Sequence, residues 1–94
     1  MSWTVILEDE NKHPIASLGE EFTTGVNLHH EAFRMLRYLD PHGDTTFNGL
    51  QQQELLTDLR LLLELEPHPL LDELISLITQ SQEKVHTYVC FYGD

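Results

Sequence analysis

Basic residues are scarce in this sequence. Five lysines and arginines stand against sixteen aspartates and glutamates in 94 residues, which gives a formal net charge of −11. A folded domain of this charge repels nucleic acids and anionic membranes, because both carry dense negative charge. We therefore expect neither nucleic acid nor a membrane surface as a direct partner.

Cysteine and long apolar runs are also lacking. Cys90 is the single cysteine, so an internal disulfide is excluded and a reducing compartment is favoured. No apolar run approaches the roughly 20 residues that span a bilayer, and no basic residues precede the first short apolar run, as they would in a signal peptide. These absences lead us to expect a soluble, cytoplasmic protein.

Apolar residues make up 40% of the chain, with leucine dominant, which is too much for a disordered protein despite the charge. At this length folding buries roughly 60–70% of the surface that the unfolded chain exposes. We expect a single compact domain over residues 1–94 with one modest core.

Both ends of the chain have strand patterns. Apolar and polar residues alternate over residues 2–8, and residues 15–18 follow a turn-like segment as a short second strand. Val85–Tyr92 is rich in β-branched and aromatic residues and apolar on both faces, which favours an inner strand. The two terminal strands are expected to pair.

Three helices are predicted between these strands. The first runs from about Leu28 to Leu39, with Asn27 as its N-cap and an apolar stripe along one side. The second follows Asn48, which forms a capping-box pattern with Gln51, and ends near residue 65. The third has Pro69 as its first residue and ends near residue 82.

The fold class that follows is α+β. We predict a small antiparallel sheet, made of the N-terminal strand or hairpin and the C-terminal strand, packed against three helices. The alternative is an almost all-helical domain with a marginal two-stranded ribbon.

The segment Asp40–Asn48 has the composition of either a turn or a metal site. Asp40, His42 and Asp44 offer oxygen and nitrogen ligands at alternate positions. The spacing does not fit an EF-hand, because Thr45 stands where that loop requires glycine. Proline, glycine, aspartate and asparagine are also the residues of tight turns, and we favour that interpretation.

Enzymatic motifs are not evident. Cys90 lies within a predicted strand among apolar residues, where a buried, inert thiol is expected. The adjacent His29 and His30 diverge by about 100 degrees on a helix and do not face one metal. We predict no enzymatic activity, no cofactor and no resident metal.

The acidic excess is concentrated in residues 38–83, where nine acids accompany a single base, Arg60. Such a region is either a solubilising surface or a face that binds a basic protein. The residues that we predict to meet such a partner are Glu54, Asp58, Glu64, Asp72, Glu73, Asp40, Asp44 and the aromatic Tyr38.

A non-catalytic binding protein fits these observations. In size and charge the chain resembles small bacterial immunity proteins, which implies inhibition of a basic toxin or enzyme through acidic steering and aromatic anchoring. No functional residue carries over from this likeness. The alternatives are a small accessory or regulatory subunit, monomeric or homodimeric, for which the surplus Leu61 and Leu65 argue, and a metal-binding protein that uses Asp40–Asp44.

Overall fold

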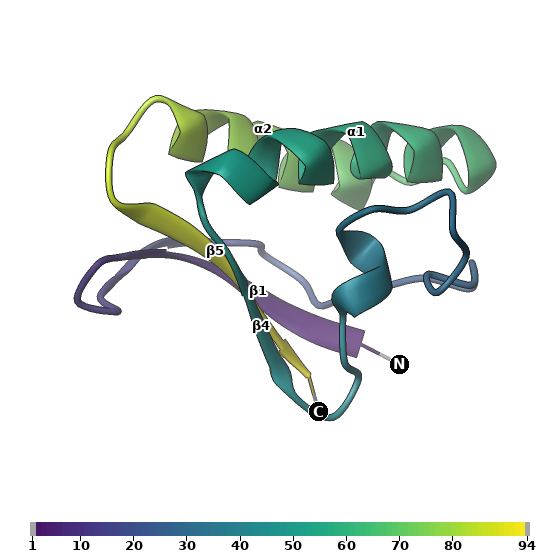
Figure 1. Ribbon diagram of the computed structural model, residues 1–94, viewed down its shortest axis with the longest axis horizontal. Helices are drawn as coiled ribbons and strands as arrows, with labels where there is room; N and C mark the ends of the chain where they lie inside the picture. Colours follow the sequence, from purple (N-terminus) through teal and green to yellow (C-terminus); the bar gives the residue numbers. More distant parts are fainter. Residues whose placement is uncertain (1, 94) are drawn as a thin grey trace.

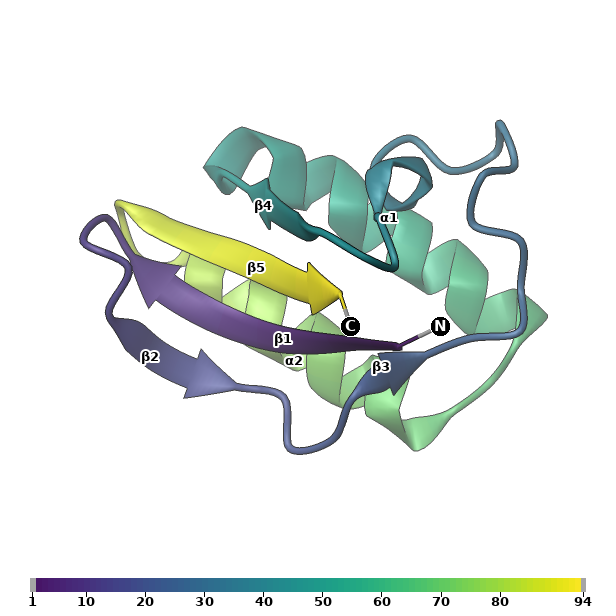
Figure 2. The same ribbon diagram turned by 90° about the horizontal axis from the view of Figure 1, so that it is seen from below.

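Two helices lie side by side on one face of an antiparallel sheet (Figure 1). The computed structural model describes residues 2–93. The α+β class and the antiparallel sheet are confirmed, and the all-helical alternative is wrong. Figure 2 looks onto the opposite face of the sheet, which the helices leave uncovered.

The sheet has five strands. Its centre is formed by β1 (Ser2–Asp9) and β5 (Thr87–Gly93), and its edges by β2 (Pro14–Ser17) and β4 (Asp44–Phe47), in the order β2-β1-β5-β4. The short β3 (Phe22–Thr23) pairs with the start of β1. The predicted strands at both ends of the chain are therefore confirmed, whereas no strand was predicted over the residues of β3 and β4.

The terminal strands pair along their whole length, as expected. The register runs from Trp3 opposite Gly93 to Asp9 opposite Thr87. Because side chains alternate along a strand, Val5 and Phe91 face the helices while their neighbours face the uncovered side. β5 is an inner strand, which explains why the C-terminal sequence is apolar on both of its faces.

The two helices begin where their capping residues predict. α1 (Gly49–Leu65) follows Asn48, whose side chain accepts the amide of Gln51, and the Gln51 side chain accepts the amide of Asn48. α2 (Pro69–Gln82) starts with proline, and His68 Nδ1 accepts the amide of Leu70 at 3.0 Å. Local sequence is sufficient to set both helix starts.

The predicted helix over residues 28–39 is wrong. The segment consists of turns and a single 3-10 helix, η1 (Leu36–Tyr38). Asn27 does accept an amide, that of His29, but it closes only a turn, and His30 Nδ1 takes the amide of Ala32 in the same way. Side chains that bond nearby amides compete with helix formation in this manner.

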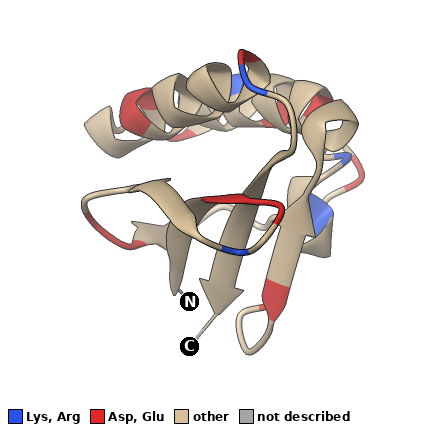
Figure 3. Cartoon of the chain, turned by 90° about the vertical axis from the view of Figure 1, so that its left-hand side faces the viewer, with Lys and Arg blue, Asp and Glu red and all other residues tan. Residues whose placement is uncertain are grey.

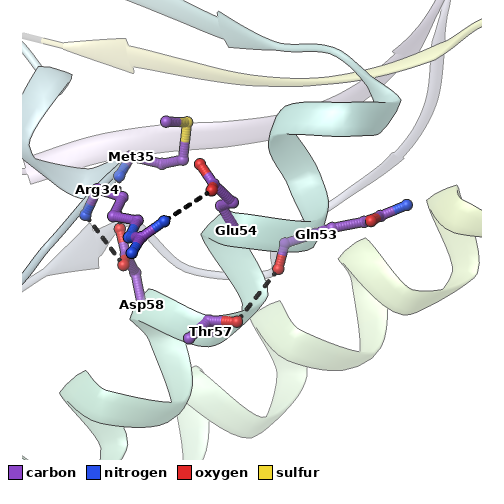
Figure 4. A network of polar contacts seen from close by, with 6 residues as sticks. All are labelled: Arg34, Met35, Gln53, Glu54, Thr57 and Asp58. Carbon is purple, nitrogen blue, oxygen red and sulfur yellow. Dashed lines mark hydrogen bonds and ion pairs between the residues drawn. The ribbon is translucent and has the colours of Figure 1, made fainter.

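Asp58 of α1 provides the second reason. Its carboxylate accepts the backbone amides of Arg34, Met35 and Leu36 at 3.1, 2.6 and 3.0 Å. Figure 4 shows Asp58 beside Arg34 and Met35. A continuous helix would use these three amides internally, so the tertiary contact replaces the helical hydrogen bonds. The apolar residues of the segment are buried all the same, with Leu36 fully inaccessible.

An aromatic cluster connects four of the strands beneath the helices. Phe91 of β5 makes edge contacts with Phe22 of β3 and Phe47 of β4, with ring centroids 5.8 and 5.7 Å apart. Trp3 of β1 contacts Phe22 at 5.7 Å. Burial of Phe22 and Phe47 explains why these two segments form strands although no strand was predicted there.

Candidate functional site

A pocket of about 240 Å³ lies on the uncovered face of the sheet, next to the turn between β1 and β2. Register brings its residues together, because Thr46 of β4 stands opposite Cys90 and Tyr88 of β5 stands opposite Glu8. The lining residues come from three strands and the turn: Glu8, Asp9, Glu10, Lys12, Asp44, Thr46, Tyr88, Cys90 and Tyr92.

Glu8 is the buried carboxylate of this pocket, with 6% of its surface exposed. It accepts hydrogen bonds from the hydroxyl of Tyr92 and from Cys90 Sγ, the latter at 3.4 Å. Thr46 Oγ1 in turn donates to Cys90 Sγ at 3.5 Å. Neutral donors therefore satisfy this carboxylate, and no lysine or arginine of the described chain contacts it.

The two donors are held in their protonated forms. The hydrogen bond to Glu8 is the main cause that raises the pKa of Tyr92, and burial adds to it. Burial is the main cause that raises the pKa of Cys90, although the hydrogen bond from Thr46 opposes the effect. The thiol is accordingly a hydrogen-bond donor at neutral pH and a poor nucleophile, as the sequence predicted for a buried cysteine.

The rim of the pocket is acidic. Asp9 accepts the amides of Asn11 and His13 at 2.8 and 2.9 Å, and the bond from His13 is the main cause that lowers its pKa. Figure 3 looks at this end of the molecule, where the turn between β1 and β2 carries acidic residues and one basic residue. That basic residue is Lys12, the only lysine or arginine that lines the pocket.

The arrangement suits a cation. Glu8, Asp9, Glu10 and Asp44 contribute four carboxyl groups against one ammonium group. Aromatic rings at the wall attract cations through their faces. The volume is below the roughly 300–1,000 Å³ that is typical of small-molecule sites, so it suits one side chain better than a larger ligand.

The structure does not bring the sequence-predicted partner residues onto one face. Asp44 lies at the edge strand β4 and lines the pocket. Asp72 and Glu73 lie at the start of α2 and share a hollow with Ser17 of β2, at the opposite edge of the sheet. Glu54 and Glu64 are exposed on α1, and Glu54 forms an ion pair with Arg34 at 3.2 Å.

Tyr38 and Asp40 form a further group. The Tyr38 side chain is 63% exposed in η1, with the Arg37 guanidinium 5.7 Å from its ring centroid. The Asp40 carboxylate accepts the amide of His42, and its carbonyl accepts Trp3 Nε1 at 2.9 Å. Asp40 thus anchors a turn, as the favoured interpretation of this segment predicted.

Asp58 differs from the other predicted partner residues. Only 3% of its surface is exposed, and its oxygens are occupied by three backbone amides. A carboxylate in this position stabilises the fold and does not present its charge to a partner. We therefore leave Asp58 out of the binding surface proposed below.

The metal alternative gains no support from the geometry. Within residues 2–93, no group of three or more histidine, cysteine, aspartate or glutamate side chains is placed to hold a metal ion. The four carboxylates that line the pocket do not form such a group either. Asp40 and Asp44 do not form a ligand set with His42.

Neither Glu8 nor Tyr92 is among the eight residues predicted to meet a partner. The signal was nevertheless present, because Glu8 is a polar position of the alternating first strand, and Tyr88, Cys90 and Tyr92 share one face of the last. In the observed antiparallel register these residues meet on the same side of the sheet, whereas a shift of one residue would place them on opposite faces. The register was needed to show which pairs lie opposite.

Comparisons with known proteins assign no family. No known protein family, curated protein or solved structure matches the chain significantly. Neither helix of residues 2–93 combines the length and the apolar character that crossing a membrane requires.

Proposed function

We propose that this chain is a non-catalytic, acidic protein-binding domain that captures a basic partner, as an inhibitor of the immunity type does with a toxin or enzyme. The observation that carries the proposal is the pocket on the uncovered sheet face. Its four carboxyl groups and two tyrosines surround a space suited to one lysine or arginine side chain of the partner.

Association would proceed in two stages. The net charge of −11 draws a basic protein toward the molecule and accelerates the encounter. A basic side chain then enters the pocket, where Glu10 and Asp44 at the rim and the buried Glu8 supply negative charge. Tyr88 and Tyr92 contribute aromatic surface, which anchors many interfaces. Inhibition follows when the bound domain covers the partner's working surface.

A lysine tetrapeptide, acetylated and amidated, is a direct probe of this pocket. Its binding is measured by NMR from the shifts of backbone amide resonances. The double variant Glu10→Gln with Asp44→Asn removes two charges from the rim, and the double variant Asp72→Asn with Glu73→Gln removes two from α2. Both double variants make the net charge less negative by the same amount. We expect the pocket variant to weaken binding about fivefold or more relative to the α2 variant, because only the pocket variant removes charges from the proposed site.

Three results would contradict the proposal. Equal weakening by the two double variants would mean that the peptide responds only to overall charge. Stronger weakening by the α2 variant would place the binding surface on the helices instead. Binding that does not weaken as salt is added would also oppose an electrostatic encounter.

The accessory-subunit alternative has its own structural feature. Leu61 and Leu65 of α1 line an apolar hollow with Val26 and Phe33, and 58% of the Leu65 side chain is exposed. A second copy of the chain is one possible cover for this surface. Sedimentation velocity across a wide concentration range tests it: a dimer that dissociates on Leu65→Ser supports the alternative, and a monomer throughout rejects it.

A further inference from the structure

A second hollow, called the groove below, adjoins the acidic pocket. It has a volume of about 460 Å³ and lies between the start of α1 and the connection from α2 to β5. Leu50 and Val85 line it, although 79% and 84% of their surfaces are exposed. Single exposed apolar residues are ordinary on protein surfaces, but two that flank one hollow form a place for an apolar side chain.

The groove and the pocket border each other. Tyr88 lines both of them. His86 of the groove and Glu10 of the pocket approach within 3.8 Å, between Nδ1 and Oε2. In residues 2–93, the two non-glycine residues with positive φ are Lys12 in the pocket and His86 in the groove. Strained backbone of this kind concentrates at binding sites, and here both instances border one surface.

Side-chain hydrogen bonds join the elements that form the floor of the groove. Gln82 Nε2 donates to the carbonyl of Gly49 at 3.0 Å and to Gln52 Oε1 at 3.1 Å, which ties the end of α2 to the start of α1. Gln52 is fully buried and donates to the carbonyls of Phe47 and Thr87. A groove that is formed before its ligand arrives costs little ordering on binding.

The pocket and the groove differ in the charged residues that line them. The pocket carries four carboxyl groups, whereas Lys84 is the single lysine, arginine, aspartate or glutamate that lines the groove. A basic side chain is therefore favoured in the pocket and disfavoured in the groove, where apolar contact with Leu50 and Val85 is available. The two halves select different residues of one bound segment.

We infer that this end of the molecule binds a short segment of the basic partner in which apolar residues adjoin a lysine or arginine. The apolar residue lies between Leu50 and Val85, and the basic residue enters the pocket beyond Tyr88. This inference rests on the proposed function, since it takes the acidic pocket as the place that receives the basic side chain.

Two hexapeptides of equal charge test the inference. One contains two lysines and two leucines, and the other has serines in place of the leucines. Isothermal titration calorimetry gives both dissociation constants for the native chain. We expect the leucine peptide to bind about tenfold more tightly, because burying one leucine side chain contributes enough for at least that factor.

The variant Leu50→Ser with Val85→Ser is expected to remove this preference and to leave the affinity for the serine peptide unchanged. Both residues are largely exposed, so the variant folds as the native chain does. Leu65→Ser is the matched control, because it is an exposed leucine at the other end of α1. The Leu65→Ser variant should still bind the leucine peptide about tenfold more tightly than the serine peptide.

The outcomes separate the two claims. Equal affinity for both peptides, or a preference that survives in the Leu50 and Val85 variant, overturns the inference while the acidic pocket stands. Loss of the preference in Leu65→Ser also overturns it, since the leucines would then bind at the other hollow. Failure of both peptides to bind, or binding insensitive to Glu10→Gln with Asp44→Asn, overturns the proposed function itself.

Discussion

At the level of single residues, the two buried carboxylates differ in the groups that donate hydrogen bonds to them. Asp58 accepts three backbone amides and fixes a segment that has little regular structure. Glu8 accepts a hydroxyl and a thiol and faces a pocket. Both are removed from water without a lysine or arginine partner, which is costly unless hydrogen bonds compensate. The first holds a backbone segment in place, and the second forms part of the wall of the pocket.

Asp58 should be among the most sensitive residues of the chain. Asp58→Asn keeps the size of the side chain but replaces one charged oxygen by an amide group that cannot accept the same bonds. We expect the free energy of unfolding to fall by about 2–3 kcal/mol, since hydrogen bonds to charged groups contribute about 1.5–3 kcal/mol. Urea unfolding followed by circular dichroism measures the change.

Glu54→Gln is the matched control for Asp58, because the residue lies one turn earlier on α1 and is exposed. Its ion pair with Arg34 is a surface pair, so the loss should stay within about 0.5 kcal/mol. Equal effects of the two substitutions would show that the three amides do not depend on the Asp58 carboxylate.

The raised pKa values of Cys90 and Tyr92 predict a loss of stability in alkali. Above the unfolded values of 9.0 and 10.0, the unfolded chain releases protons that the folded chain keeps. Stability is therefore fully present below those values and falls as the pH rises toward the folded ones. Urea unfolding at about pH 8 and about pH 10.5 should show a lower free energy at the higher pH.

Tyr92→Phe identifies the source of this loss. The variant cannot ionise at position 92, so its free energy of unfolding should decline less between the two pH values than that of the native chain. Its stability at about pH 8 should be lower, because Glu8 loses a donor in a buried place. A decline as steep as that of the native chain would assign the alkaline loss to other groups.

At the level of elements, prediction succeeded where local signals suffice. Asn48 with Gln51 and His68 with Pro69 mark helix starts through contacts between residues at most three apart. The first predicted helix failed because its outcome depends on Asp58, which lies more than twenty residues away in the sequence. β3 and β4 were missed because two to four residues give too short a pattern.

The candidate site was predictable only in part. The sequence marked Asp44 and the aromatic last strand, and it paired the terminal strands correctly. It did not join them into a pocket, since the edge position of β4 and the place of the β1–β2 turn are products of tertiary packing. The acidic residues of α1 and α2 that were predicted to meet a partner look alike in sequence, although the structure places them on different parts of the molecule.

The contrast between Asn48 and Asn27 gives a test at this scale. Both were predicted as N-caps, yet only Asn48 starts a helix. Asn48→Ala should lower the free energy of unfolding by about 1 kcal/mol, the usual effect of losing an N-cap. Asn27→Ala opens only a turn and should cost less. Urea unfolding ranks the two, and a larger effect at Asn27 would contradict the assignment.

At the scale of the whole molecule, repulsion dominates the electrostatics. Among residues 2–93, Glu8 and Asp58 are the buried acidic residues, and the other aspartates and glutamates are partly or largely exposed. Across residues 2–93, Arg34 and Glu54 form the only contact within 4 Å between a lysine or arginine and a carboxylate. The folded state therefore concentrates like charges that the unfolded chain spreads apart, which destabilises it.

Salt should accordingly stabilise the fold. Raising sodium chloride from about 0.02 M to about 0.5 M shortens the screening length below the spacing of most surface charges. We expect the melting temperature to rise by about 5 °C, equivalent to about 1 kcal/mol for a domain of this size. Thermal unfolding followed by circular dichroism measures it.

Two substitutions that each remove one negative charge distinguish repulsion between acidic residues from ion pairing. Glu73 shares a hollow with Glu20, so Glu73→Gln relieves repulsion and should raise the melting temperature at low salt. Glu54→Gln instead removes an attraction to Arg34 and should not raise it. Because screening acts on the same repulsion, the salt-induced rise should be smaller in Glu73→Gln than in Glu54→Gln. Identical responses of the two variants, or a native melting temperature that falls with salt, would show that the acidic surface is not a source of instability.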